Sequence, residues 1–122
     1  PAELERASRL GVNVVSSDEL ARTPTEAVRR ALAFLPSGYL AVHVDVDVLD
    51  FTDAPLAEST DGRNTGPGLD QLATALQIAL AEPRVRVFSI GELNPTRSAG
   101  DPTAIPRFLA AIVAALAGSV PA

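Results

Sequence analysis

Three side chains that could do chemistry share one apolar stretch near the middle of the chain. Residues 42–48 read VHVDVDV, so His43, Asp45 and Asp47 occupy every second position between valines. Successive side chains of a β-strand point to opposite faces, so all three would lie on one face of a strand. An ionised carboxylate that is buried without a partner costs several kcal/mol, so the pattern predicts a cationic partner for these acids.

A divalent metal ion is the partner that the spacing favours. Acids at alternate positions of a strand lie about 7 Å apart, so Asp45 and Asp47 could converge on one ion or a pair just past the strand end. Oxygen ligands suit Mg²⁺ or Mn²⁺ better than softer metals. His43 is further from the strand end, which favours a place behind the metal ligands over direct ligation. The simpler alternative is that water solvates the acids at the end of a strand.

A third acid, Glu92, follows the last apolar run in the sequence GELNP at residues 91–95. If this run is a parallel neighbour of the first, Glu92 lies near Asp45 and Asp47 at the same edge of the sheet. A carboxylate there could accept a forked hydrogen bond from a guanidinium group of a substrate. Capping of the following loop is an equally good interpretation of this glutamate.

The elements that must position these acids alternate along the chain. Strands are predicted at residues 11–15, 39–48 and 85–90. Each is followed by a helix: one capped by the box TPTE at residues 23–26, one with an apolar face over residues 69–80, and one over residues 105–116. The order βαβαβα predicts an α/β fold with a parallel sheet, a three-layer αβα arrangement and one domain over residues 1–122. Ligands of such folds bind beyond the carboxyl ends of the strands.

Composition restricts the remaining possibilities. The chain has 122 residues, is 47% hydrophobic and carries a net charge of −5, which argues against nucleic acid or an anionic membrane as partner. It has no cysteine, which excludes disulfides, zinc-thiolate sites and a thiol nucleophile. No apolar run reaches the roughly 18 residues of a membrane span, and no signal peptide is recognised, so a cytoplasmic location is expected.

Four short sequences in order, VHVDVDVLD, AP at residues 54–55, GPGL at 66–69 and ELNP at 92–95, resemble the C-terminal part of the ureohydrolases. This family includes arginase, agmatinase and formimidoylglutamase. The resemblance implies an α/β fold with a binuclear manganese site, whose bridging hydroxide hydrolyses a C–N bond of a guanidino or formimino substrate. Asp45 resembles the metal-bridging aspartate and Asp47 the aspartate that binds one metal. Glu92 resembles the glutamate that contacts the guanidinium end of the substrate.

The chain also departs from the family pattern. His43 stands where serine is usual, Phe51 replaces a proline, and the loop over residues 55–66 is longer than is typical. The family's upstream metal-ligand sequences, of the forms GGDH and DAHxD, are absent. The chain begins with Pro1 and contains no methionine. We therefore expect a C-terminal portion of a ureohydrolase that is inactive by itself.

Two other classes of function remain as alternatives. A phosphatase resembling the haloacid dehalogenases would use Asp45 as nucleophile and Asp47 as acid, but its pattern usually has Thr or Val where this chain has Leu49. A non-catalytic module would associate with itself. The expected partners are a small guanidino substrate and a second copy of the chain, paired through an exposed sheet edge.

Overall fold

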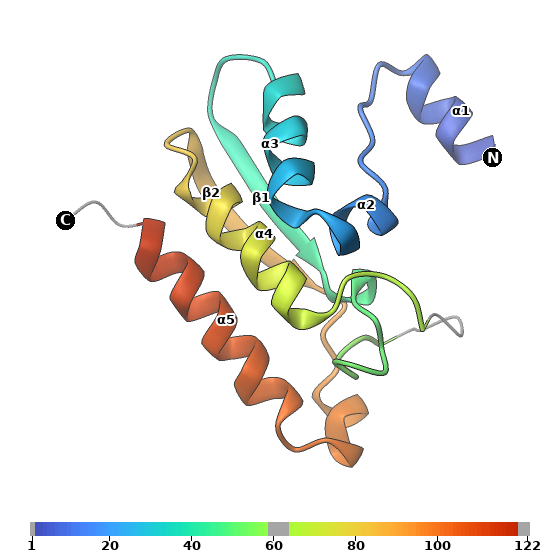
Figure 1. Cartoon of the computed structure of the whole chain (residues 1–122), viewed down its shortest axis with the longest axis vertical. Helices are drawn as coiled ribbons and strands as arrows, with labels where there is room; N and C mark the ends of the chain where they lie inside the picture. The colour runs from blue at the N-terminus through green and yellow to red at the C-terminus, as the bar shows by residue number, and fades with distance from the viewer. Residues whose placement is uncertain (1, 59–63, 120–122) are drawn as a thin grey trace.

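A computed structural model describes residues 2–58 and 64–119 (Figure 1). In chain order its elements are α1 (Ala2–Arg9), α2 (Ser17–Arg22), α3 (Pro24–Phe34), β1 (Leu40–Asp45), the 3₁₀ helix η1 (Val46–Val48), α4 (Leu69–Ala81), β2 (Val85–Gly91), the 3₁₀ helix η2 (Pro95–Gly100) and α5 (Ala104–Ser119). No helix in this part of the chain is both long and apolar enough to cross a membrane.

The two strands pair in parallel, as the sequence predicts. His43 lies opposite Ser89, and Asp45 lies opposite Gly91, the last residue of β2. Helix α4 connects the two strands, and its buried leucines pack over them. The α/β class with a parallel sheet is therefore confirmed, and the acids of the first strand end beside the end of the second.

Helices α3, α4 and α5 lie on one side of the sheet (Figure 1). The core forms there, where Val44 and Val46 pack with leucines of α4 and with Phe108 and Ile112 of α5. The opposite face carries exposed side chains from both strands: Ala41, His43, Val87 and Ser89. The described residues thus supply two of the three expected layers, and the face that bears His43 has no helix over it.

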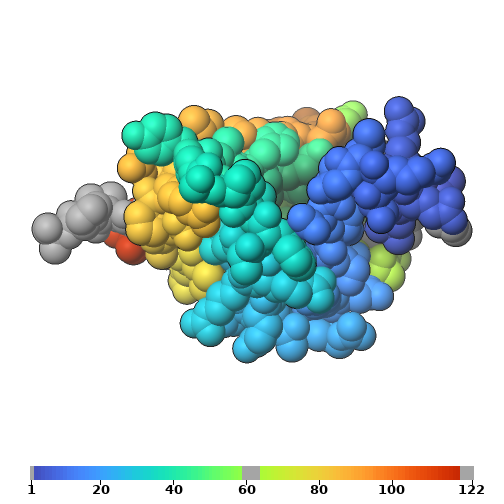
Figure 2. All heavy atoms as spheres, turned by 90° about the horizontal axis from the view of Figure 1, so that it is seen from above, coloured from blue at the N-terminus to red at the C-terminus, as the bar shows by residue number. Residues whose placement is uncertain are grey.

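The strand expected at residues 11–15 is wrong. Helix α1 ends in a Schellman motif, in which Gly11 adopts a φ of +69° and the N–H of Val12 donates to the carbonyl of Ala7 (2.9 Å). The segment after it runs beside α3 without a ladder partner, and Val12 and Val14 are 54% and 46% exposed. Figure 2 shows this N-terminal segment, in dark blue, as a lobe at one side of the molecule. A β-branched segment forms a β-strand only where another strand can pair with it, and none of the described strands lies beside residues 11–15.

Candidate metal and substrate site

Asp45 and Asp47 lie where the chain leaves β1. Strand β1 ends at Asp45, three residues earlier than predicted, and the N–H of Leu49 closes the turn η1 on the carbonyl of Val46 (3.2 Å). This turn sends both Val46 and Leu49 into the core, where they are 0% and 2% exposed. Both aspartates remain half-buried. Asp47 is therefore on a turn, not on the strand face that the alternation predicts.

The carboxylate of Asp45 shows a feature that calls for a ligand. Its Oδ1 is buried and has no hydrogen-bond partner among the residues that the structure describes. Buried carboxylate oxygens are normally paired, because an unmade bond leaves the full cost of desolvation. Within residues 2–58 and 64–119, however, no three His, Cys, Asp or Glu side chains gather closely enough to hold a metal ion.

His43 is held against the second strand. Its Nδ1 lies 2.8 Å from Oγ of Ser89, its partner in the ladder. The ring fills the space beside Gly91, where a Cβ atom would lie 3.1 Å from Cε1 and 3.2 Å from Nε2. The same Cβ would lie 3.7 Å from Oδ1 of Asp45. The imidazole and this carboxylate oxygen thus both lie beside Gly91, where the ring takes room that a side chain at position 91 would need.

Glu92 follows directly and has an unusual backbone. Its φ is +60°, in the left-handed region that residues other than glycine seldom adopt. The loop after β1 fixes it there. The N–H of Glu58 donates to the carbonyl of Glu92 (2.9 Å), the N–H of Asn94 donates to that of Leu56 (2.8 Å), and an antiparallel bridge between Ala57 and Leu93 lies between. Strained backbone held in this way is frequent at functional sites.

The side chains around this bridge lock it further. Nδ2 of Asn94 donates to Oε2 of Glu58, and Arg97 donates to the carbonyl of Glu58 (2.8 Å). Oδ1 of Asn94 also accepts from the N–H of Thr96 (2.9 Å) and caps η2. The loop that leaves the aspartates and the segment that carries Glu92 therefore form one unit. Residues 59–63 of the long loop lie outside the described part of the chain.

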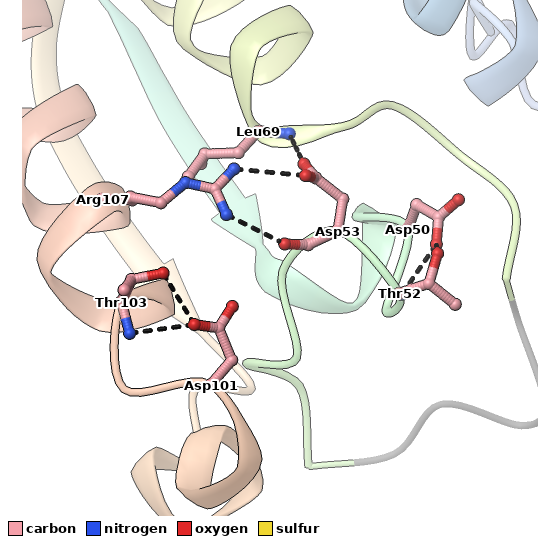
Figure 3. A network of polar contacts seen from close by, with 7 residues as sticks. All are labelled: Asp50, Thr52, Asp53, Leu69, Asp101, Thr103 and Arg107. Carbon is pink, nitrogen blue, oxygen red and sulfur yellow. Dashed lines mark hydrogen bonds and ion pairs between the residues drawn. The ribbon is translucent and has the colours of Figure 1, made fainter.

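Asp53, which sequence reasoning missed, ties the loop to two helices (Figure 3). Its Oδ2 accepts from the N–H of Leu69 at the start of α4 (2.6 Å), while Oδ1 and the main-chain carbonyl each accept from Arg107 of α5 (3.2 Å). A carboxylate at a helix N-terminus satisfies an unpaired N–H and complements the helix dipole. No local pattern signals it, because the partners lie 16 and 54 residues away.

Asp50 has a structural role. Its Oδ1 accepts from both the N–H and the hydroxyl of Thr52, at 2.8 and 2.6 Å (Figure 3). The Thr52 hydroxyl bond, followed by the main-chain bond, lowers the pKa of the Asp50 carboxyl. Asp101 forms the same turn with Thr103 before α5, and the pKa of its carboxyl is lowered in the same way. Asp50 is thus occupied in a turn that supports the loop.

Comparisons with known proteins show the family and the fold. The family model described as "Arginase family" matches residues 1–117. The solved structure of the arginase of Helicobacter pylori superposes with a TM-score of 0.82 at 19% identity, covering 96% of this chain and 40% of that one. The formimidoylglutamase of Bacillus subtilis gives 0.70 at 26%, covering 96% and 36%. The proclavaminate amidino hydrolase of Streptomyces clavuligerus gives 0.73 at 22%, covering 95% and 38%. No curated protein matches. The chain spans about two-fifths of the length of these solved chains.

Proposed function

Because the chain belongs to the arginase family, we propose that it forms the C-terminal part of a hydrolase that cleaves a C–N bond of a guanidino or formimino substrate. One observation carries the proposal. The chain brings a buried carboxylate oxygen of Asp45, which has no partner in the described part of the chain, to the same sheet edge as Glu92, the residue after the ladder partner of Asp45. The first feature suits a cation and the second suits a cationic substrate group.

The residues present fit part of a manganese site. Oδ1 of Asp45 is an oxygen ligand with no hydrogen-bond partner among the described residues, and it lies near Gly91. Asp45 and Asp47 would hold the metal, with the remaining ligands supplied from outside the described residues. Two bound manganese ions would supply a hydroxide at neutral pH.

The chain's own residues then orient the substrate. Glu92 would accept hydrogen bonds from the guanidinium or formimino nitrogens, which places the carbon under attack beside the two aspartates. The bridge between residues 56–58 and 92–94 fixes the backbone of Glu92 before substrate arrives. Since the same bridge includes the loop at Glu58, changes in that loop would alter the room for the rest of the substrate.

The test is hydrolysis by a protein that joins this chain to the remaining part of the arginase fold. Release of urea, or of the corresponding amide, is measured with arginine, agmatine and formimidoylglutamate in the presence of Mn²⁺. Asp45→Ala and Asp47→Ala should each remove most activity and lower the bound manganese. The control Asp18→Asn, on the exposed helix α2, should change neither. Full activity and full manganese in the Asp45→Ala protein would overturn the proposal, and Mg²⁺-dependent phosphatase activity would support the rival class.

By itself, this chain should bind Mn²⁺ weakly and hydrolyse none of these substrates. Its described residues offer no cluster of three ligands, so too few donors are in place for tight binding of a metal ion. Isothermal titration calorimetry measures the affinity directly. Sub-micromolar binding of Mn²⁺ would show that the ligand set within these 122 residues is sufficient.

A further inference from the structure

The only histidine of the chain is fixed from two directions by strand β2. Ser89 holds Nδ1 at 2.8 Å, which leaves Nε2 on the far side of the ring. Gly91 admits the ring, since a Cβ at that position would lie 3.1 Å from Cε1 and 3.2 Å from Nε2, closer than most Cβ contacts. The imidazole is therefore oriented by its neighbours and not merely exposed on a bare sheet face.

Nε2 of His43 and Oδ1 of Asp45 both lie beside Gly91. Nε2 of His43 and Oδ1 of Asp45 lie 3.2 and 3.7 Å from the same point, the position of the missing Cβ of Gly91. Oδ1 is buried and has no partner within the described residues, so it requires a donor or a cation. An imidazole nitrogen and a carboxylate oxygen that lie near the same glycine form a donor pair that suits a divalent transition-metal ion.

We propose that Oδ1 of Asp45 and Nε2 of His43 together bind one divalent cation. Ser89 fixes the imidazole ring, and Gly91 provides room for the ring. This inference rests on the proposed function for the role of Asp45 and adds His43 as a nitrogen ligand. Neutral imidazole coordinates a metal through the ring nitrogen that carries no proton. The hydrogen-bond partner of the other nitrogen fixes the proton there and so determines which nitrogen binds the metal. In the tautomer in which Nδ1–H donates a hydrogen bond to Oγ of Ser89, Nε2 is the ligating atom.

The single histidine makes the test direct. Its two ¹⁵N ring resonances are recorded by long-range ¹H–¹⁵N correlation while Zn²⁺, a diamagnetic probe, is added up to millimolar concentration. We expect the Nε2 resonance to move to a coordinated position while Nδ1 remains protonated. Asp45→Asn and His43→Gln should each abolish specific binding, and Ser89→Ala should weaken it by about tenfold, as loss of a ligand's hydrogen-bond partner typically does. Ser89→Thr, which keeps the hydroxyl, should restore the affinity.

Glycine variants test the geometry with a matched control. Gly91→Ala should displace the ring and weaken Zn²⁺ binding, whereas Gly100→Ala, where an added Cβ meets no atom within 4 Å, should leave it unchanged. Circular dichroism of both variants checks that the fold persists.

An unchanged affinity in a folded Gly91→Ala protein, or Zn²⁺ binding without a shift at Nε2, would overturn the inference. If Zn²⁺ binds without a shift at Nε2 and Asp45→Asn abolishes this binding, Asp45 is a metal ligand and His43 is not. No Zn²⁺ binding at all would overturn the inference, while the hydrolysis assay would still decide the proposed function.

Discussion

Replacement of Asp53 by alanine should destabilise the chain by about 1–3 kcal/mol, mainly through helix α4. The carboxylate accepts the N–H of Leu69 at 2.6 Å, and loss of such a cap costs about 0.5–2 kcal/mol. The ion pair with Arg107 adds less, about 0.2–1 kcal/mol, because both side chains are 41% exposed. The cap should therefore contribute the larger share of the loss.

Three variants separate these contributions by urea unfolding, followed by circular dichroism. Asp53→Ala removes both interactions, Asp53→Asn keeps a neutral acceptor for Leu69, and Arg107→Gln removes only the contacts to α5. We expect the loss of unfolding free energy to decrease in that order. The reasoning would be refuted if Arg107→Gln destabilised the chain as much as Asp53→Ala, since the ion pair would then dominate over the cap.

Three further predictions follow from the loops and the sheet. The pKa of Asp50 is lowered, so its bonds to Thr52 stabilise the fold above the unfolded pKa, and this contribution is lost as pH falls through the lower, folded pKa. The urea midpoints of Thr52→Val and wild type should therefore differ at about pH 6 and converge as the pH falls below the ordinary aspartate pKa of about 3.9. Gly66→Ala should destabilise by about 1–3 kcal/mol, because φ is +119° and the new Cβ would lie 2.4 Å from the carbonyl oxygen of Val48, whereas Gly118→Ala in α5 should be neutral or stabilising by thermal unfolding. Each described strand has one unpaired edge, so sedimentation should detect self-association at tens of micromolar; a clean monomer would contradict this.

The parallel strands and the helix between them could be predicted because long apolar runs with distinct periods specify them. The end of β1 could not. Alternation of valine and aspartate continues through residues 46–48, but the burial of Val46 and Leu49 bends the backbone into a 3₁₀ turn. The buried pair Val46 and Leu49 is three residues apart, as in a 3₁₀ turn, whereas the valine–aspartate alternation in the sequence indicates a period of two.

Interactions across long separations were also beyond local patterns. The capping box predicted at Thr23 does not form: its side chain makes no cap hydrogen bond to α3, and its hydroxyl donates to the carbonyl of Glu19 in the preceding helix α2 (3.3 Å). The pairing of Ser89 with His43 and the tie from Asp53 to Arg107 depend on which elements become neighbours. The positions of Asp45 and Glu92 at one sheet edge could be inferred, whereas the contacts that orient them required the structure.

The left-handed backbone of Glu92 sets chemistry and folding stability against each other at one position. Glycine would adopt a φ of +60° with less strain, and asparagine tolerates it better than glutamate. A library of variants at this position, sorted only for thermal stability, should therefore enrich residues such as glycine and asparagine. These residues have no carboxylate to accept hydrogen bonds from a guanidinium group. Engineering a more robust form of this chain would need a counter-selection for ligand binding, because the most accessible stabilising change removes the group proposed to recognise substrate.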